Sequence, residues 1–371
     1  MWNRISSLIW KEILAVLFDP KSRLSIFIPP LIQLFIFTFA ATLDVKDVPI
    51  GILNQDSGEQ SIELIERLHG SPMFQQIVFL KGVQEIGPFI DNQKGLMVVS
   101  FTETFSRLLN ADKKADIQLI LDGRRSNSAQ IVSGYITTIV DQFNSEFAAL
   151  ERYPQQNAKL YPINWFNPNL LYYWYNNPSL VATLSMLTCL IVTTQSIARE
   201  RELGTFDQLL VSPLVPLEIL IGKIVPGIII GMAEGSLMIA IGVFILGVPF
   251  TGSIFLFLAA LLVFVTAISG IGLFISSLSA TQQQAMLGTF VFMMPSILLS
   301  GFATPVENMP EWLQPAAYAI PLTYMLVISK GIYLKAMPAL IVFENIWPMV
   351  IIGFCTILGA GWFFRRRISY T

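Results

Sequence analysis

Residues that carry chemistry are scarce in this chain of 371 residues. It has one histidine, His69, and two cysteines, Cys189 and Cys355, which lie in separate apolar runs. This pattern predicts neither a disulfide framework nor a metal site. The sequence also lacks a Gly-x-x-x-x-Gly-Lys-Ser/Thr loop, a His-Glu-x-x-His motif and a Gly-x-Ser-x-Gly elbow. We therefore predict no catalytic residue, no metal, no cofactor bound by this chain and no ATPase activity of the phosphate-loop kind.

Charge is scarce as well, since only 13% of the residues are charged and 54% are hydrophobic. The mean hydropathy of +0.62 is too high for a soluble globular protein and indicates a membrane protein with several spans. The net charge of −2 gives no sign of nucleic-acid binding. More than half of the charged side chains lie between Asp44 and Lys159, so we expect the soluble part of the protein there.

Six apolar stretches are long enough to cross a hydrocarbon core of about 30 Å, which takes about 20 helical residues. We predict spans at 24–43, 177–198, 218–247, 253–278, 285–303 and 338–364. Residues 316–334 come close to a seventh span, but Pro315 and Pro321 punctuate this region and Lys330 would be costly in lipid. We predict outer re-entrant or interfacial helices at 304–337.

Basic residues then set the orientation, because cytoplasmic loops carry an excess of lysine and arginine. The basic side chains of the leader 1–23, the segment 199–213 and the tail 365–371 fall on one side of the six predicted spans. Both termini are therefore predicted to be cytoplasmic, with an interfacial helix at 1–23 and a basic tail at 365–371. Residues 44–176 then lie outside the cytoplasm.

Residues 44–176 alternate between strand-like and helix-like segments, which indicates an α/β layer. The predicted strands are 49–53, 76–80, 95–100 and 116–121, and the predicted short helices are 58–68, 84–92 and 103–109. A long helix at 126–150 follows, with an apolar stripe at helical spacing. The predicted fold class is an α-helical polytopic membrane protein with six transmembrane helices and an α/β extracytoplasmic domain between spans 1 and 2.

A charged run between spans 2 and 3 holds the most informative pattern. Within 199–213, apolar residues recur at helical spacing, and Pro213 follows them. The pattern predicts an amphipathic helix on the cytoplasmic surface. Two interpretations remain open from periodicity alone: a surface that a soluble partner grips, or an ordinary interfacial helix that anchors a loop.

Three motifs carry a resemblance to a known family. They are Glu200-Arg201-Glu202-x-Gly204-Thr205-x-Asp207-Gln208-Leu209 followed by Pro213; Ser300-Gly301-Phe302-x-x-Pro305-x-x-x-Met309-Pro310-x-Trp312 followed by Ile320-Pro321-Leu322-Thr323-Tyr324; and Trp10-Lys11-Glu12 with Asp19-Pro20-Lys21. Together they resemble the type-2 permeases of ATP-binding-cassette (ABC) transporters. The large segment after the first span is similar to the bacterial drug-exporter-like branch of that family.

The resemblance implies that 199–213 is a coupling helix that docks into a separate ATPase subunit, which would bind ATP and Mg. The implied coupling residues are Arg199, Glu200, Arg201, Glu202, Gly204, Thr205, Phe206, Asp207 and Gln208. It implies an elbow helix at 1–23, and an outer re-entrant motif with Gly301, Pro305, Pro310, Trp312, Pro321 and Tyr324. Implied partners are a second permease, identical or paralogous, membrane lipid, and in some systems a membrane-fusion adaptor.

Glu234 is the acidic residue that lies deepest in a predicted span. An ionisable group at that depth is costly, so it is a candidate for the translocation path. The alternative is a protonated carboxyl hydrogen-bonded between helices, which the small neighbours Gly231 and Gly235 would bring close together.

We therefore predict the permease subunit of an ABC exporter of the bacterial inner membrane, which moves an amphiphile such as a drug or lipid. A secondary transporter is one alternative, but it calls for two related halves and more intramembrane charges. A receptor or scaffold that senses through the outer domain is another. The identity of the substrate, the pairing of the two permeases and the role of the outer domain stay open.

Overall fold

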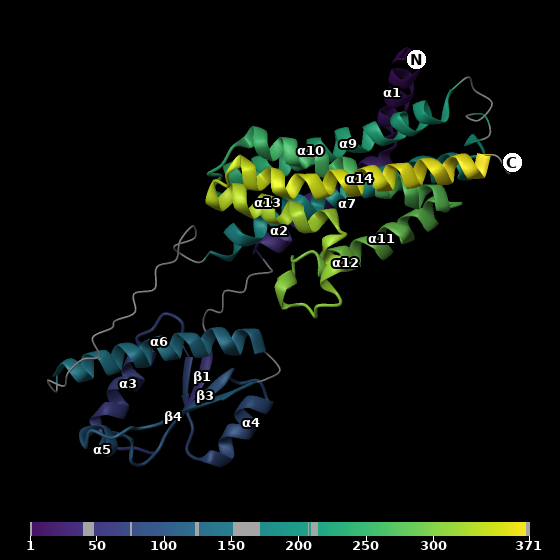
Figure 1. Cartoon of the computed structure of the whole chain (residues 1–371). Helices are drawn as coiled ribbons and strands as arrows, with labels where there is room; N and C mark the ends of the chain where they lie inside the picture. Colours follow the sequence, from purple (N-terminus) through teal and green to yellow (C-terminus); the bar gives the residue numbers. More distant parts are fainter. Residues whose placement is uncertain are drawn as a thin grey trace. The chain divides into compact units, whose positions relative to one another are not determined.

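The computed structural model describes residues 2–39, 48–74, 76–122, 126–150, 171–206, 208 and 214–368. The chain forms two compact units, one made of Met1–Ala41 with Asn164–Thr371 and the other of Thr42–Ile163 (Figure 1). The first unit is helical, and the second is an α/β layer.

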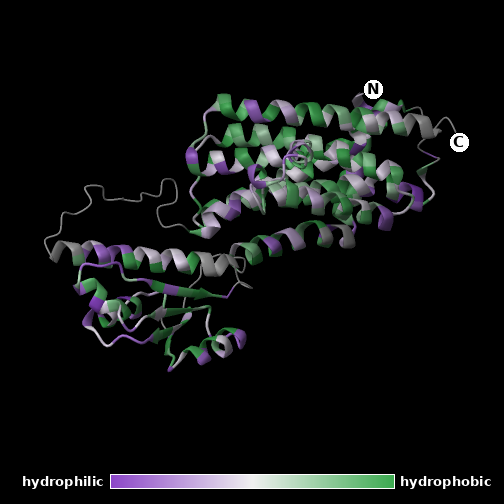
Figure 2. Ribbon diagram, turned by 60° about the horizontal axis from the view of Figure 1, so that its bottom comes forward, coloured by the Kyte–Doolittle hydropathy of each residue, from purple (hydrophilic) through white to green (hydrophobic). Residues whose placement is uncertain are grey.

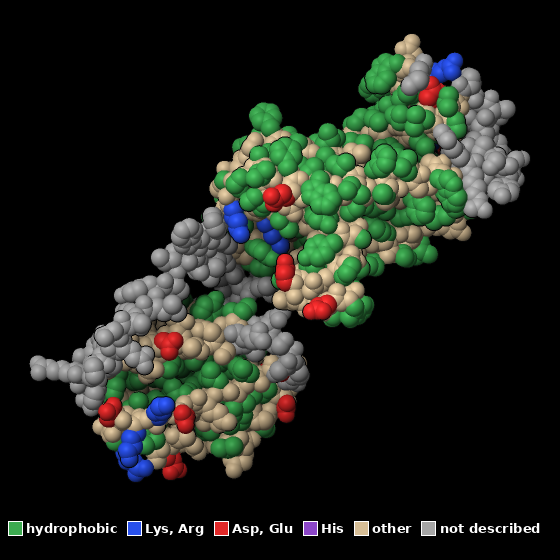
Figure 3. All heavy atoms as spheres, viewed as in Figure 1, with side chains coloured by type: hydrophobic (Ala, Val, Ile, Leu, Met, Phe, Trp, Pro, Cys, Tyr) green, Lys and Arg blue, Asp and Glu red, His purple; other side chains and the backbone are tan. Residues whose placement is uncertain are grey.

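The helical unit consists of helices of very different length. They are α1 (Trp2–Phe18), α2 (Pro20–Phe39), α7 (Tyr172–Glu202), α9 (Pro216–Ala240) with a π-helical turn (Ile241–Ile245), α10 (Ile254–Leu278), α11 (Gln282–Leu299), α12 (Gln314–Tyr318), α13 (Pro321–Lys335) and α14 (Ala339–Ile368). A 3-10 turn (Val306–Asn308) precedes α12. Hydrophobic side chains cover the face of this unit that Figure 3 shows, as expected for a surface that meets lipid.

Four helices of the described residues are long and apolar enough to cross a membrane. They are Tyr172–Glu202, Pro216–Ile245, Ile254–Leu278 and Ala339–Phe363. A shorter apolar helix covers Ile26–Phe39. The predicted spans 24–43 and 285–303 fall on α2 and α11, and their crossing of the membrane stays a prediction. At the far end, α14 continues to Ile368, so the tail predicted from residue 365 begins as helix.

Helix α7 forms the centre of the unit. Of its most apolar window, 89% is buried, against 22% for the window of α14. Helices α2, α9, α10, α11 and α13 all contact it. Small residues of α9 allow the closest approach, because a Cβ atom on Gly227 would collide with Thr193, and one on Gly235 with Leu261 and Ser185.

The start of α7 corrects the predicted domain boundary. Residues up to 176 were expected to belong to the inserted segment, but α7 already begins at Tyr172. Asn176 and Asn177 look like linker residues in the sequence, yet both are buried. The Asn176 side-chain amide donates to the Phe37 carbonyl of α2 at 3.0 Å, which anchors the N-terminal end of α7 to α2.

The α/β unit holds one four-stranded sheet. Its elements are β1 (Pro49–Asn54), α3 (Glu59–His69), β2 (Gln76–Phe79), a 3-10 turn (Val83–Glu85), α4 (Ile86–Asp91), β3 (Met97–Phe101), α5 (Phe105–Asn110), β4 (Ile117–Leu121) and α6 (Ser126–Leu150). The strand order is β2-β1-β3-β4. Strands β2 and β3 run parallel to β1, and β4 runs antiparallel to β3.

Helices α3, α5 and α6 pack on one face of this sheet, and the short helix α4 packs on the other. Ile52 of β1 packs in one cluster with Leu64 of α3 and Ile136 of α6. On the opposite face, Phe89 of α4 packs with Val98 of β3. The alternation of the sequence thus forms the α/β layer that it predicts, and Figure 2 shows mainly hydrophobic residues along its strands and many hydrophilic ones in its helices and loops.

Candidate functional site

The predicted coupling segment begins at the end of α7, which stops inside it. The Thr205 N–H donates to the Glu200 carbonyl at 2.9 Å, and the Gly204 N–H donates to the Arg201 carbonyl at 3.1 Å. Gly204 has φ +71, a left-handed conformation that glycine adopts without steric cost. These bonds form a Schellman motif, which ends a helix. The prediction of one continuous helix over 199–213 is therefore wrong at Gly204.

Residues 199–202 are instead the last turn of α7. Phe206 and Gln208 are helical again. The remaining residues of the predicted helix, Asp207 and 209–213, lie outside the described residues. The turn at Gly204 leaves Glu202, Leu203 and Gly204 exposed at the tip of the segment.

Four charged side chains from three helices meet at this end of α7; we call them the ion-pair cluster. They are Lys11 and Glu12 of α1, Glu200 of α7 and Lys223 of α9. Glu200 Oε1 lies 2.6 Å from Lys11 Nζ and 2.8 Å from Lys223 Nζ. Lys223 Nζ also lies 2.8 Å from Glu12 Oε1. Two cations thus face two anions.

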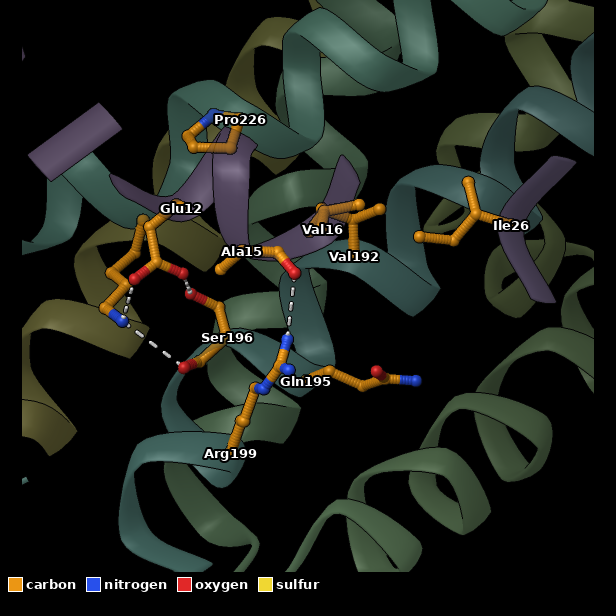
Figure 4. A pocket seen from close by; sticks show the side chains of 10 residues that line it. Glu12, Ala15, Val16, Ile26, Val192, Gln195, Ser196, Arg199 and Pro226 are labelled. Atoms are coloured by element: carbon orange, nitrogen blue, oxygen red, sulfur yellow. Dashed lines mark hydrogen bonds and ion pairs between the residues drawn. The ribbon is translucent and has the colours of Figure 1, made fainter. Parts of the chain in front are cut away.

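Two side chains of the cluster are buried, since that of Lys223 is 1% exposed and that of Glu200 is 7% exposed, whereas that of Lys11 is 55% exposed. Lys223 Nζ also donates to the Ser196 carbonyl at 3.3 Å, and Ser196 Oγ donates to Glu12 Oε2 at 3.2 Å (Figure 4). Removing one partner of a buried ion pair leaves an uncompensated charge, which costs roughly 3–5 kcal/mol. The cluster therefore ties α1 firmly to α7 and α9.

Lys11 lies at the open side of the cluster, outside the spanning helices. Burial acts to lower its pKa, but the hydrogen bond and the charge of Glu200, together with the charge of Glu12, raise the pKa of Lys11 above its ordinary 10.5. Lys11 is therefore positively charged over the whole physiological pH range.

Arg199 adds a second link between α7 and the leader. Its Nη2 lies 3.4 Å from Asp19 Oδ2, and its Nη1 donates to the Ala15 carbonyl at 3.4 Å. Beside it lies a cavity of about 20 Å³, which Glu12, Ser196 and Lys223 also line (Figure 4). That is room for about one water molecule, with polar groups to hold it.

Arg201 and Glu202 bind the turn between α10 and α11. Arg201 Nη1 donates to the carbonyls of Ser277 and Ser279, each at 2.8 Å. The backbone N–H of Gln282, the first residue of α11, donates to Glu202 Oε2 at 2.8 Å. Glu200 is buried, and Arg201 and Glu202 bind within the chain, so these three side chains hold helices of the permease together. Docking of the segment 199–213 into a partner stays a prediction.

Comparison with known proteins identifies the family of this chain. Residues 21–362 match the family described as ABC-2 family transporter protein. The chain belongs to this family. It is the permease subunit of an ABC exporter, and membership implies an ABC ATPase as a partner. The interpretations as a secondary transporter or a receptor are therefore dropped.

Relatives of this permease agree in length as well as in sequence. Probable multidrug ABC transporter permease YbhR of Escherichia coli (strain K12) is 45% identical over 369 residues, covering 99% of this chain and 100% of that protein. Probable multidrug ABC transporter permease YbhS of the same organism is 29% identical, covering 99% of this chain and 97% of that protein. ABC transporter G family member 23 of Dictyostelium discoideum is 23% identical over 90% of this chain and 48% of its own length. The matches and the apolar helices support a multi-pass protein of the inner membrane.

Glu234 of the permease lies in α9 and is 1% exposed. Neither carboxyl oxygen makes a hydrogen bond of regular geometry among the described residues, but Thr188 of α7 lies close enough to the carboxyl to interact with it. The place of Glu234 on a translocation path and its alternative role, a carboxyl hydrogen-bonded between helices, both stay predictions.

The predicted outer motif follows α11. Gly301 has φ +88, which lets the chain turn after α11, and Trp312 is exposed before α12. Pro321 is the first residue of α13, and the Tyr324 hydroxyl donates to the Tyr318 carbonyl at 2.8 Å. Pro305 and Pro310 flank the 3-10 turn at Val306–Asn308. The motif thus folds as short helical pieces that lead into α13.

Sequence reasoning missed the role of Lys223, which lies within the predicted span 218–247. A lysine inside an apolar run is costly unless an acidic group pairs with it. That signal points to a buried anion, and the structure identifies Glu12 and Glu200.

Proposed function

We propose that this permease exports amphiphilic compounds, such as drugs or lipids, out of the cytoplasm or the inner membrane. A separate ATPase subunit binds ATP and Mg and supplies the energy, while this chain has no catalytic role of its own. Two relatives carry the word multidrug in their names, which supports this substrate class. The single observation that carries the mechanism is the ion-pair cluster, which joins the end of α7 to α1 and α9.

The proposed route of force starts at the tip formed by Glu202, Leu203 and Gly204. These residues are exposed, whereas Glu200, two residues earlier, is buried in the cluster. A partner that pushes on the tip moves the last turn of α7, and the ion pairs carry that movement to α1 and α9. ATP binding then favours one arrangement of the spanning helices because the ATPase binds it better.

The proposed assembly is the one that the family resemblance implies. Helices α2 and α11 complete six spans, both termini are cytoplasmic, and the α/β unit is extracytoplasmic. Two permeases, identical or paralogous, frame the path, and a membrane-fusion adaptor docks outside. The concentration of basic residues at 1–23, 199–213 and 365–371 supports this orientation.

The experiment is co-purification of the ATPase with the permease, followed by ATPase assays with candidate amphiphiles. In the test variant, Leu203→Asp, a side chain that is 65% exposed is replaced at the proposed contact. The matched control is Leu217→Asp in the first turn of α9, where Leu217 is 54% exposed. We expect Leu203→Asp to insert normally but to lose substrate-stimulated ATP hydrolysis, which Leu217→Asp keeps. Equal stimulation in both variants would show that the tip is not the contact.

A further inference from the structure

Along one side of α9 and its π-helical turn, glycines face small or polar side chains of α7. A Cβ atom on Gly231 would lie 3.2 Å from Cys189 Cβ, and one on Gly242 would lie 3.2 Å from Asn177 Cγ. Such small residues let two helix backbones approach closely. The contacts recur along the two antiparallel helices, and we call them the glycine seam. Its pairs are Gly227 with Thr193, Gly231 with Cys189, Gly235 with Ser185, and Gly242 with Asn177.

Helix α7 is hydrogen-bonded to α10 and α11 along much of its length. Cys189 Sγ lies 3.0 Å from Ser269 Oγ of α10, and Thr194 Oγ1 lies 2.9 Å from Thr289 Oγ1 of α11. Arg201 adds its bonds to the turn between α10 and α11 at the end of α7. These bonds make α7, α10 and α11 one body.

Helix α9 is held to its neighbours at one end. In the described part of the chain, every ion pair and every hydrogen bond of regular geometry between a side chain of α9 and another helix comes from Lys223, in the ion-pair cluster. The α7 hydroxyls that face the glycines bond within their own helix instead. Ser185 Oγ donates to the Val181 carbonyl and Thr193 Oγ1 to the Cys189 carbonyl, each at 2.7 Å. The cluster thus pins one end of α9, and packing holds the rest of the seam.

The opposite end of the seam buries polar groups that have no partner. Asn177 is 0% exposed, and neither its side-chain oxygen nor its nitrogen has a hydrogen-bond partner among the described residues. Ser179 Oγ and Trp174 Nε1, at the same end of α7, also lack one there. Burying such groups unpaired costs free energy. Across the seam, Gly242 belongs to the π-helical turn, a form found where helices kink. Closure of the seam is therefore weakest at this end.

From these observations we infer that the glycine seam opens from the Asn177 end, with the ion-pair cluster as its pivot. Helix α9 swings away from the body of α7, α10 and α11, and the Asn177 amide then bonds to water. Glu234 lies between the two ends, so the opening brings water toward its carboxyl. The inference rests on the proposed function for its driving force, a push by the ATPase that reaches α9 through the cluster. The opening itself is a property of the permease.

The test measures labelling of single cysteines in the purified permease and needs neither an ATPase nor transport. Cys189→Ser and Cys355→Ala first remove the native thiols. Asn177→Cys and Thr193→Cys then each place one thiol on the seam face of α7, where both residues are 0% exposed. A water-soluble maleimide should label Asn177→Cys at least about tenfold faster, because a minor open state populated at ~0.1–10% exposes only that thiol. Equal rates would overturn the proposal.

Ile332→Cys is the control for general loosening at this end of the helical unit. Ile332 of α13 is also 0% exposed, and it packs against Gly252 outside the seam. It lies near the same end, because the neighbouring Lys330 donates to the Tyr175 hydroxyl of α7 at 2.8 Å. Ile332→Cys should react as slowly as Thr193→Cys. Labelling as fast as that of Asn177→Cys would show fraying of the whole end and would overturn the assignment to the seam.

Two engineered disulfides connect the opening to transport. Asn177→Cys with Gly242→Cys closes the far end. Thr193→Cys with Gly227→Cys closes the seam near the pivot, where Thr193 Cβ lies 3.7 Å from a Cβ atom on Gly227, within the range of a disulfide. Oxidation should abolish substrate-stimulated ATP hydrolysis in the first variant, reversibly on reduction, and spare it in the second. Full activity of the oxidised first variant, or equal loss in both, would contradict the pivot. If no amphiphile stimulates even the unmodified complex, the export function fails while the labelling result stands, so the two failures are distinguishable.

Discussion

Lys223 Nζ of α9 lies 2.8 Å from Glu200 Oε1 of α7, and neither side chain is more than 7% exposed. These two residues join the helix that leads to the proposed ATPase contact with the helix that carries Glu234. The loss of either partner would leave a buried charge unpaired. The pair therefore favours the packing of α7 on α9 in which these two side chains meet.

The first prediction concerns this pair. Lys223→Met removes a buried cation and leaves Glu12 and Glu200 without it, so the permease should lose roughly 3–5 kcal/mol of stability. The control is Lys11→Met, because the side chain of Lys11 is 55% exposed and Glu200 keeps Lys223 when Lys11 is removed, so the loss should be only about 1 kcal/mol. Thermal unfolding in detergent measures both. The double variant Lys223→Met with Glu200→Gln should recover part of the loss, and no recovery would refute the pairing.

The second prediction concerns the end of α7. Gly204→Ala places a Cβ atom on a left-handed residue and should destabilise the permease by about 1–2 kcal/mol. Gly359→Ala is the control, since Gly359 lies within helix α14 and a Cβ there meets nothing within 4 Å. In a helix interior the same substitution is stabilising by roughly 0.5–1 kcal/mol. Melting temperatures that shift in opposite directions are expected, and a neutral Gly204→Ala would contradict the helix end described above.

The third prediction concerns acid stability of the α/β unit. Asp56 accepts hydrogen bonds from the Ser106 hydroxyl and from the Gly58 N–H. Burial acts to raise its pKa, but the bonds from Ser106, Ser61 and Gly58 lower the pKa of Asp56 below its usual 3.8. A lowered pKa stabilises the folded state above pH 3.8, and that contribution is lost as the pH falls through the lowered value.

Hydrogen exchange of the full-length protein in detergent tests this prediction. Protection of the segment from β1 to α3 should decline below about pH 4, and Asp56→Asn should already lower it at neutral pH. The exposed Asp91, at the end of α4, serves as the control through Asp91→Asn. If Asp56→Asn kept the wild-type dependence on pH, the assignment to Asp56 would be wrong.

The fourth prediction contrasts two buried carboxyls of α9. Glu234 makes no hydrogen bond of regular geometry in the described part of the chain, with only the Thr188 side chain of α7 near its carboxyl, whereas Glu218 Oε2 accepts from the Val215 N–H at 3.0 Å and caps the helix. Glu234→Leu should therefore leave stability unchanged or raise it by about 1–3 kcal/mol, the cost of an unsatisfied buried polar group. Glu218→Leu should lower it by about 1 kcal/mol, as the loss of a cap does.

Transport assays on these two variants separate stability from function. If Glu234 lies on the translocation path, the Glu234→Leu permease should lose transport and keep its thermal stability. Full transport by Glu234→Leu would remove Glu234 from the path. A loss of stability in that variant would instead point to a structural partner for this carboxyl.

Much of this protein follows from local pattern. Long apolar runs determine spanning-length helices, as in α7, α9, α10 and α14, because no other structure hides its backbone polar groups in lipid. The alternation between 49 and 121 determines an α/β layer, and the motif within 199–208 predicts a coupling role for the end of α7.

Tertiary structure alone decided the roles of the individual charges. The helical spacing of Arg199 to Glu202 says nothing of Lys11 and Lys223, which approach Glu200 only when α1 and α9 pack on α7. It likewise decided that α7 stops at Gly204 and that glycines of α9 face α7 along the glycine seam. Periodicity reports which face of a helix is apolar, but the partner of a buried charge depends on contacts between residues far apart in the chain.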